Sequence, residues 1–367
     1  MRIELVSHYD LTVPGGVQQQ VAGLAGALVS IDDANRVLVV APGAARAQLA
    51  PGVQRVDVGR SIAVAVNGSR APVAPQPSAW RRTVAALAQF HPDVVHLHEP
   101  LVPGPCMACL RAPTSPVVAT FHRAGASTSY RLAASLLGSM LAHISLAVAV
   151  SEEAARTLRS VAGGAVQLDA VIPNAVALDR FAGATPEGSP RPTVVFVGRH
   201  EARKGLAVLI EALPLLGQSV RVRIVGDGPE RVRLRSATHA DGRVEWLGRV
   251  GDDELAAIVA GADVLVAPSR SGESFGVVLL EAMAAGTAVV ASDLPGYRLA
   301  AGDAALYVAP GDASELAGAI GRVLADDPLR LELVARGRRL AAGHDFSGLA
   351  AAYLTRYRRL VAGGEAR

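Results

Sequence analysis

Two glutamates, Glu273 and Glu281, stand on either side of a short loop, with seven residues between them. The loop follows an apolar run, 263–267, that predicts a buried parallel strand, and it leads into helix formers, 277–285, that end at Gly286. A helix that starts at the carboxyl end of a parallel strand presents free N–H groups, which favour a phosphate. Carboxylates only accept hydrogen bonds, so both acids suit ribose or hexose hydroxyls. Spacing alone still favours a helix-dipole partner for Glu273 and a solvated face for Glu281.

A second group of candidate residues lies in a basic turn after the apolar run 193–198. Arg199 and Lys204 stand in this turn, and Lys204 is the single lysine among 36 basic residues. In a chain that uses arginine for nearly every cation, a lone lysine indicates a need for a compact ammonium, with chance as the alternative. Two fixed cations beside an anion-binding loop can stabilise a departing diphosphate without a metal ion. A solvated basic turn is the other interpretation.

The elements that must position these groups repeat one pattern: a short apolar run, a loop and a helical stretch. This alternation predicts an α/β fold with parallel, doubly wound, Rossmann-like sheets, and 367 residues suffice for two such domains. The domains are predicted at 1–180 and 181–348, with a Gly-, Pro- and Ser-rich linker at 181–191 and a final segment at 349–367 whose helix covers about 349–361. The runs that predict strands are 2–6, 36–40, 53–58, 93–98, 117–121, 145–150, 193–198, 220–225, 243–247, 263–267 and 287–292.

Glycines and histidines mark the predicted loops of the first half. The pair Gly15-Gly16 follows the first strand and permits close approach of a bulky anion or sugar, although most such pairs are only turns. His98 and His122 end two later strands at the edge where ligands bind in such sheets. For a lone histidine, a structural hydrogen bond is the favoured interpretation.

Composition limits the class of protein. Half of the residues are hydrophobic and 19% are charged, which excludes a disordered or fibrous chain. No apolar run reaches the roughly 20 residues of a membrane span, and the chain opens directly on a strand pattern, so a cytoplasmic protein is predicted. A net charge of +3 without a nucleic-acid motif is compatible with anionic substrates or a membrane surface and predicts no nucleic-acid partner. Cys106 and Cys109 are too few for a zinc site and predict half-buried helix thiols.

The segment around the two glutamates, Gly-Glu-Ser-Phe-Gly-x4-Glu-Ala-Met-Ala-x-Gly, resembles the signature of the retaining GT-B glycosyltransferases of family 4. Matching segments extend the resemblance over nearly the whole chain. It implies two Rossmann-like domains that face each other across a cleft, with a last helix that crosses back onto the first domain. It also implies transfer of a hexose from a nucleoside diphosphate sugar, with retained configuration. No Asp-x-Asp motif is present, and neither a metal ion nor another cofactor is expected.

The resemblance also assigns roles to individual residues. Glu273 would bind hydroxyls of the donor sugar, Arg199 and Lys204 the diphosphate, and His122 would lie beside the transferred sugar, so these four are the predicted catalytic residues. Glu281 would bind the ribose. The other predicted donor-binding residues are Gly16, Gly198, Gly226, Gly228, Val250, Ser274, Phe275 and Gly276. The predicted acceptor-binding residues are Tyr9, Gly15, Gln18 and Asn67.

Within family 4 the chain resembles the actinobacterial phosphatidylinositol mannosyltransferases, through segments that include 14–18, 67–69 and 119–122. This implies GDP-mannose as the donor, an inositol lipid as the acceptor and peripheral contact with an anionic membrane at its inner face. The corresponding amphipathic segment, 80–86, carries only two arginines, which predicts weak contact. Two alternatives stay open: a transferase that uses another donor and a soluble polyol or natural product, and a GT-B protein that binds a sugar nucleotide without transferring it. The intact set of predicted catalytic residues argues against the second.

Overall fold

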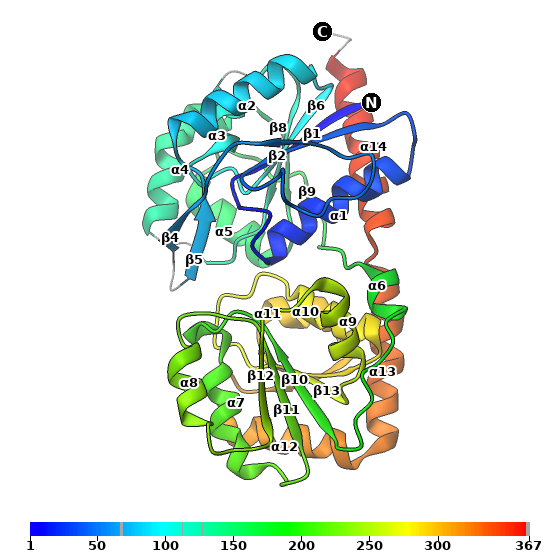
Figure 1. Cartoon of the computed structure of the whole chain (residues 1–367). Helices are drawn as coiled ribbons and strands as arrows, with labels where there is room; N and C mark the ends of the chain where they lie inside the picture. The colour runs from blue at the N-terminus through cyan, green and yellow to red at the C-terminus, as the bar shows by residue number, and fades with distance from the viewer. Residues whose placement is uncertain (67–68, 112, 126–127, 365–367) are drawn as a thin grey trace. The chain divides into compact units, whose positions relative to one another are not determined.

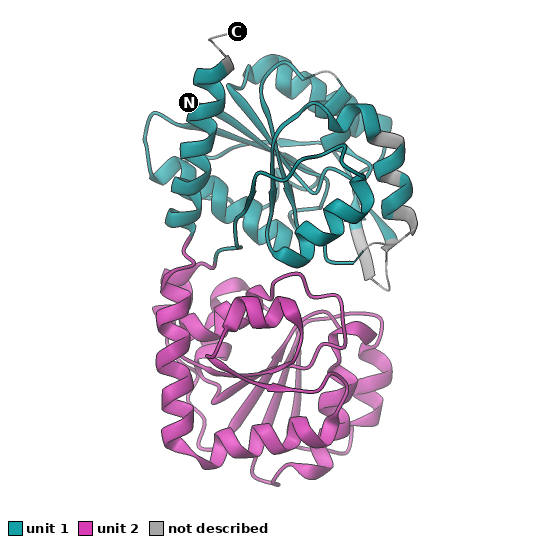
Figure 2. Ribbon diagram, turned by 180° about the vertical axis from the view of Figure 1, so that it is seen from behind, with its two compact units in different colours: residues 1–175, 346–367 teal, residues 176–345 magenta. Residues whose placement is uncertain are grey.

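The computed structural model describes residues 1–66, 69–111, 113–125 and 128–364. The chain forms two compact units (Figure 2): unit 1 comprises Met1–Ala175 and Phe346–Arg367, and unit 2 comprises Val176–Asp345. Asn67, one of the predicted acceptor-binding residues, lies outside the described residues.

Unit 1 is built on a parallel sheet of seven strands in the order β3-β2-β1-β6-β7-β8-β9. The order runs outward in both directions from the neighbours β1 and β6, as in a doubly wound sheet. The central strands are buried runs rich in Val, Ile and Leu, because helices cover both faces of the sheet (Figure 1). The strands are β1 (Arg2–Ser7), β2 (Arg36–Ala41), β3 (Gln54–Asp57), β6 (Val94–His98), β7 (Val117–Phe121), β8 (Ile144–Ala149) and β9 (Ala170–Val171).

Two hydrophobic cores form on the two faces of this sheet. Ile3 and Leu5 of β1 join the core beneath α1 and α14, whereas Val6 joins the core with α2 to α5, because successive side chains of a strand point to opposite faces. The last helix, α14, packs beside α1 within unit 1. The helices are α1 (Gly16–Ser30), α2 (Pro77–Phe90), α3 (Pro105–Arg111), α4 (Thr128–Leu141), α5 (Glu152–Ala162) and α14 (Phe346–Gly364).

The cysteines and a hairpin differ from the sequence prediction. Cys106 and Cys109 lie on α3 as expected, but both thiols are fully buried rather than half-buried, because α3 packs between α2 and the sheet. An unpredicted antiparallel hairpin, β4 (Ile62–Val66) and β5 (Ser69–Val73), follows β3.

Unit 2 repeats the doubly wound topology with six parallel strands in the order β12-β11-β10-β13-β14-β15. The strands are β10 (Thr193–Val197), β11 (Arg221–Val225), β12 (Val244–Gly248), β13 (Val264–Ala267), β14 (Ala288–Ser292) and β15 (Ala305–Val308). The helices are α6 (Leu178–Ala182), η1 (Ala202–Lys204), α7 (Leu206–Ala212), η2 (Leu213–Leu215), α8 (Arg231–Ala237), α9 (Asp252–Ala260), α10 (Val277–Ala285), α11 (Pro295–Ala301), α12 (Ala313–Ala325) and α13 (Asp327–Ala342).

The helix predicted at 277–285 is confirmed as α10, and Gly286 caps it in the left-handed conformation with φ 81°. Each strand predicted in the first and second halves has a counterpart within one or two residues. The predicted α/β fold class, with two parallel, doubly wound sheets, is therefore confirmed. No helix in the described part of the chain is both long enough and apolar enough to cross a bilayer.

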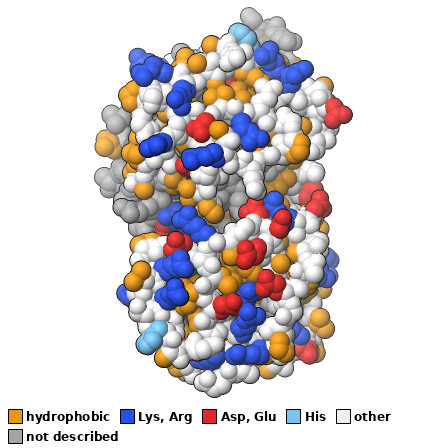
Figure 3. All heavy atoms as spheres, in the orientation of Figure 1, with side chains coloured by type: hydrophobic (Ala, Val, Ile, Leu, Met, Phe, Trp, Pro, Cys, Tyr) orange, Lys and Arg blue, Asp and Glu red, His pale blue; other side chains and the backbone are white. Residues whose placement is uncertain are grey.

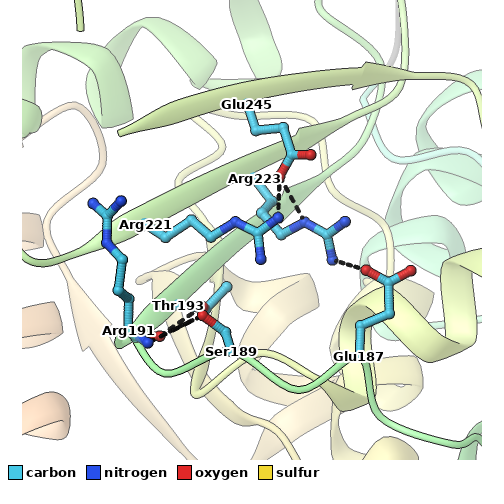
Figure 4. A network of polar contacts seen from close by, with 7 residues as sticks. All are labelled: Glu187, Ser189, Arg191, Thr193, Arg221, Arg223 and Glu245. Carbon is cyan, nitrogen blue, oxygen red and sulfur yellow. Dashed lines mark hydrogen bonds and ion pairs between the residues drawn. The ribbon is translucent and has the colours of Figure 1, made fainter. Parts of the chain in front are cut away.

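The chain enters unit 2 after Ala175 and leaves it after Asp345, so the segment predicted as a linker, 181–191, lies inside unit 2. Phe181 is buried in the core of unit 2. Figure 4 shows how the rest of the segment is tied to the sheet: Glu187 lies 2.7 Å from Nη1 of Arg223 on β11, and Arg223 also contacts Glu245. Composition rich in Gly, Pro and Ser indicates irregular backbone, but not the point at which a chain leaves a domain.

Candidate functional site

In unit 2, the residues predicted to bind the diphosphate, Arg199 and Lys204 (the predicted clamp), lie at the same edge of the sheet as the predicted sugar-binding acid, Glu273. Lys204 lies in η1, which follows β10, and Glu273 lies in the loop between β13 and α10. Strands β10 and β13 are neighbours, and the strand order reverses between them. In open α/β sheets, ligands bind outside the carboxyl ends of the strands at this switch point. The topology thus brings together two segments that are about 70 residues apart in sequence.

Glu273 is the centre of a compact charged cluster. Lys204 Nζ lies 2.7 Å and Arg203 Nη1 lies 3.2 Å from its Oε1, and Ser269 Oγ donates a hydrogen bond of 3.0 Å to the same oxygen. The Glu273 side chain is 8% exposed. Burial alone would raise the pKa of this carboxyl, but the charges of Lys204 and Arg203 and the hydrogen bonds outweigh it, so the pKa lies below the ordinary value. The cluster therefore keeps a buried negative charge beside cations.

A second acid, Glu201, organises the remaining cations of this cluster. Its carboxylate is fully buried and lies 2.6 Å from Arg199 Nε and 3.3 Å from Arg203 Nε. Arg203 thereby bridges Glu201 and Glu273, while the Arg199 side chain stays 34% exposed. Sequence reasoning singled out Arg199, Lys204 and Glu273 but missed Glu201 and Arg203. The alternation of basic and acidic residues in the turn 199–204 is the sequence feature that could have indicated these two residues.

The residues of the loop before α10 differ in burial and therefore in which of their atoms can face a ligand. The side chain of Phe275 is buried in the core of unit 2, so only its backbone can face a ligand. Gly276 precedes α10 with φ 106°, and no side chain caps the helix, so the first N–H groups of α10 are left for another partner. Ser274 is half-buried beside them, and Glu281 lies one turn further along with 6% exposure. The roles of these residues towards a donor stay predictions.

The glycine loops predicted to follow the nucleotide are joined through their backbones. Gly198 N donates to Val225 O, and Gly226 N donates to Gly248 O, at 3.1 and 2.7 Å. A Cβ added at Gly226, where φ is 119°, would lie 2.0 Å from the Gly198 carbonyl oxygen. Close packing of these loops thus requires glycine at 226 whether or not a nucleotide is bound. Gly228 and Val250 lie in the same loops at the carboxyl ends of β11 and β12.

In unit 1, the predicted acceptor residues follow β1. Gly15 and Gly16 form the start of α1, and a Cβ added at Gly16 would meet no atom within 4 Å. The Gln18 side chain donates to the Asp10 carbonyl at 3.4 Å. Tyr9 is half-buried, pairs with Val73 of β5 and lies 4.1 Å from the His8 ring, centroid to centroid. The unpredicted hairpin therefore supports the loop that carries Tyr9.

His122 belongs to a buried polar network rather than standing alone. Its Nε2 lies 3.1 Å from His98 Nδ1, and His96 bonds to Thr120 and to Tyr357 of α14 at 2.7 and 2.6 Å. Burial lowers the pKa of His122 to about 3, and burial followed by the charge of His122 lowers that of His96 to about 3. These imidazoles are therefore neutral and act as hydrogen-bonding groups. His98, His122 and Asn174 line a small cavity with Tyr353.

Glu99 holds the backbone beside His122. Its carboxylate accepts a 2.8 Å hydrogen bond from His122 N and another from the Tyr130 hydroxyl. Glu99 adopts φ 60°, an unusual conformation for a residue other than glycine. Burial raises the pKa of its carboxyl above the ordinary value, although both hydrogen bonds oppose this rise. In the described part of the chain, no group of three or more His, Cys, Asp or Glu side chains is arranged to hold a metal ion.

Comparison with known proteins covers both units. Residues 14–180 match the family described as Glycosyltransferase Family 4, and residues 191–326 match Glycosyl transferases group 1. A phosphatidyl-myo-inositol mannosyltransferase of Mycolicibacterium smegmatis is 40% identical, over 99% of this chain and 95% of its own length. A protein of the same name from Mycobacterium leprae is 39% identical, over 99% and 98%.

Solved structures show the same fold. Sucrose-phosphate synthase from Thermosynechococcus elongatus superposes with a TM-score of 0.80 at 24% identity and covers 99% of both chains. Anabaena HepE, in complex with UDP and glucose, superposes with a TM-score of 0.75 at 19% identity, over 98% of this chain and 100% of its own. The chain therefore belongs to glycosyltransferase family 4 and is a glycosyltransferase with the GT-B fold.

Proposed function

We propose that this glycosyltransferase moves mannose from GDP-mannose to the inositol of a phosphatidylinositol-type lipid, with retention of the anomeric configuration. The observation that carries the proposal is the 40% identity to a phosphatidyl-myo-inositol mannosyltransferase along nearly the whole length of both chains. Two of the segments that carry proposed acceptor and donor residues, 14–18 and 272–286, lie in this matched length.

The charged cluster of unit 2 supports the donor half of the reaction. Arg199 and Lys204 supply cations, and α10 adds the partial positive charge of a helix N-terminus whose N-cap residue, Gly276, provides no side-chain hydrogen bond. In the proposed reaction these groups stabilise the diphosphate as it leaves, without a metal ion. Glu273 accepts hydrogen bonds from hydroxyls of the mannose, and Glu281 from those of the ribose.

The proposed retention requires a route that does not use a carboxylate nucleophile beside His122. Retaining glycosidases use a free carboxylate as nucleophile. Glu99 already accepts two hydrogen bonds, and burial raises its pKa, so it is a poor nucleophile. In the proposed route the acceptor hydroxyl attacks from the face of the departing diphosphate. The diphosphate oxygen takes the hydroxyl proton as the bond from the anomeric carbon to the leaving oxygen breaks.

The acceptor half of the proposal rests on unit 1. Tyr9 and the Gly15-Gly16 loop follow β1 at the switch point of that sheet, where an inositol ring would stack on the Tyr9 ring. Docking to anionic lipid would use α2, on which Arg81 is exposed and Trp80 is half-buried. Arg82 is exposed but also donates to the Asp57 carbonyl, so this surface is a weak membrane anchor at the inner face of the membrane.

The same weakness favours a second candidate, transfer to a soluble polyol. Over the face shown in Figure 3, Lys and Arg side chains are dispersed with Asp and Glu side chains among them. A 2-deoxystreptamine glucosyltransferase of Streptomyces kanamyceticus is 33% identical over 56% of this chain. A soluble acceptor would need no membrane contact.

A radiolabelled transfer assay separates the two candidates. GDP-mannose carrying labelled mannose is incubated with phosphatidylinositol vesicles and, in parallel, with soluble inositol phosphates. We expect label in the lipid, and we expect Arg81→Gln to lower vesicle binding by about 1 kcal/mol, with the difference lost at high salt. Label that reaches only a soluble acceptor, or that arrives only from a UDP-sugar, would reject the proposal and leave the family assignment intact.

A further inference from the structure

We propose that Ser269 and Tyr297 are positioning residues that hold the Glu273 carboxylate in the orientation that receives the donor sugar. This inference rests on the proposed function, because it takes Glu273 as the acid that binds sugar hydroxyls. Ser269 follows β13, and Tyr297 lies in α11 of the same unit. Both residues are 1% exposed, so their hydroxyls must find partners within the protein.

The hydrogen bonds between these residues have a single direction. Ser269 Oγ lies 3.0 Å from Glu273 Oε1 and 2.7 Å from Tyr297 Oη. A carboxylate only accepts hydrogen bonds and a serine hydroxyl has one hydrogen, so Ser269 donates to Glu273. Tyr297 must then donate to Ser269. Burial, followed by the charge of Glu273, raises the pKa of the Tyr297 phenol well above its ordinary value, so it retains this hydrogen.

The chain of hydrogen bonds from Tyr297 through Ser269 to Glu273, called the relay below, gives the two carboxylate oxygens of Glu273 different surroundings. Ser269, Lys204 and Arg203 all contact Oε1. The shortest contact that each of these three side chains makes with the carboxylate is to Oε1, which favours Oε2 as the acceptor for a sugar hydroxyl. A carboxylate with both oxygens engaged by cations would have less capacity for a neutral ligand.

The cations alone would not maintain this difference. The ammonium of Lys204 is a compact charge with rotatable donors, and Arg203 is shared with Glu201. The terminal torsion of a glutamate is broad, so the carboxylate can turn while it keeps its ion pairs. The Ser269 hydroxyl is a buried, directional donor that Tyr297 in turn orients. It therefore selects one rotation of the carboxylate.

Close packing of the backbone at Gly296 brings Tyr297 near Ser269 and Glu273. A Cβ added at Gly296 would lie 2.2 Å from the Glu273 carbonyl oxygen, so the start of α11 packs directly against the loop that carries the acid. Tyr297 is the next residue and reaches Ser269 from this helix. The sequence Pro-Gly-Tyr at 295–297 thus places the phenol as well as starting the helix.

Binding measurements on full-length variants test the relay. The probes are GDP-mannose and GDP, which differ by the sugar that Glu273 contacts. We expect Ser269→Ala to weaken GDP-mannose binding about tenfold and to leave GDP binding unchanged, because a hydrogen bond to a charged group is worth about one factor of ten or more. Tyr297→Phe should act in the same direction with a smaller effect. The double variant should bind no more weakly than Ser269→Ala, since the two residues act as one unit.

Thr287→Val is the matched control, because it removes another buried hydroxyl of unit 2. Thr287 precedes β14, and its hydroxyl donates a 2.6 Å hydrogen bond to the Val259 carbonyl. Thermal unfolding of every variant shows whether the fold persists. Equal losses for GDP and GDP-mannose, or unchanged discrimination between them in Ser269→Ala, would overturn the relay. If the wild type binds UDP-glucose and UDP instead, that pair replaces the probes and only the donor proposal fails. A wild type that binds no sugar nucleotide would overturn both.

Discussion

Glu273 in unit 2 and Glu4 in unit 1 are both buried carboxylates, yet their pKa values move in opposite directions. Glu4 lies on the central strand β1 with 0% exposure, and neither of its carboxylate oxygens has a hydrogen-bond partner among the described residues. Burial raises its pKa to about 8. Glu273 experiences the same desolvation, but Lys204, Arg203 and Ser269 lower its pKa below the ordinary value. Burial thus decides the charge of a carboxyl only where no cation opposes it.

The same contrast extends to the two predicted sites. Unit 2 surrounds its acids with three cations, as an anionic diphosphate requires. In unit 1, burial lowers the pKa values of His96 and His122, so both imidazoles stay neutral and offer hydrogen bonds to a neutral, hydroxyl-rich ligand. The charged groups of unit 2 therefore suit the proposed donor, and the neutral polar groups of unit 1 suit the proposed acceptor. Four predictions test this contrast.

The largest effect is expected at the cations of unit 2. Lys204→Ala and Arg199→Ala should each lower kcat by about 100- to 1,000-fold, because a preorganised charge contact with a leaving group contributes roughly 3 to 4 kcal/mol to the barrier. Steady-state transfer rates and thermal unfolding measure the loss and the integrity of the fold. Arg233→Ala is the control, since Arg233 lies on α8 with a 63% exposed side chain and forms an ion pair with Glu230. Rates within a few-fold of wild type would refute the clamp.

Glu4 should make stability depend on pH in a way that Glu273 does not. The folded pKa of Glu4 is about 8, above its ordinary value of 4.5, so its stabilising contribution is complete below pH 4.5 and is lost as pH rises through 8. Glu273, with a lowered pKa, contributes stability above its ordinary pKa that is lost on acidification.

Thermal unfolding of wild type and Glu4→Gln between about pH 5 and pH 9 checks this sign. The variant should gain on the order of 4 kcal/mol relative to wild type as pH rises, because the pKa of Glu4 differs by about 3.5 between its folded and ordinary values. Parallel pH profiles for the two proteins would mean that Glu4 finds a partner.

A smaller change is expected from chelation. Because cations and the α10 N-terminus are proposed to replace a metal ion at the diphosphate, EDTA should alter the transfer rate by less than about twofold. The assay compares untreated enzyme, EDTA-treated enzyme and EDTA-treated enzyme with added Mg²⁺. Activity that disappears with chelator and returns with Mg²⁺ would contradict the proposal.

No change at all is expected at the histidines of unit 1. Burial holds the pKa values of His96 and His122 at about 3, so NMR resonances of these imidazoles should not shift between about pH 5 and pH 8. His122→Asn identifies the resonance of His122 by its loss. Protonation near neutral pH would show that the network opens to water and would weaken the contrast with unit 2.

Local pattern predicted the elements well, because helix and strand formation depend on nearby residues. The helix 277–285 with its cap at Gly286 is the clearest case, since helix formers and a terminal glycine act within a few residues. The linker at 181–191 was wrongly placed, because whether Phe181 is buried depends on a core built from distant segments. The sequence prediction also missed the hairpin β4–β5, which lies between the strands predicted at 53–58 and 93–98.

By itself the sequence determined the two parallel sheets and the residues that carry charge at their loops. Glu273, Arg199 and Lys204 were singled out because their segments resemble those of the family 4 glycosyltransferases, whereas residue type and spacing alone favoured a structural role for Glu273. Only the tertiary structure decided what those charges face. Glu201 and Ser269 reach the cluster from the loops after β10 and β13, and Tyr297 reaches it from α11, which follows β14. These three strands are neighbours only in the folded sheet. A pKa depends on such neighbours and on burial, which are properties of the packed chain.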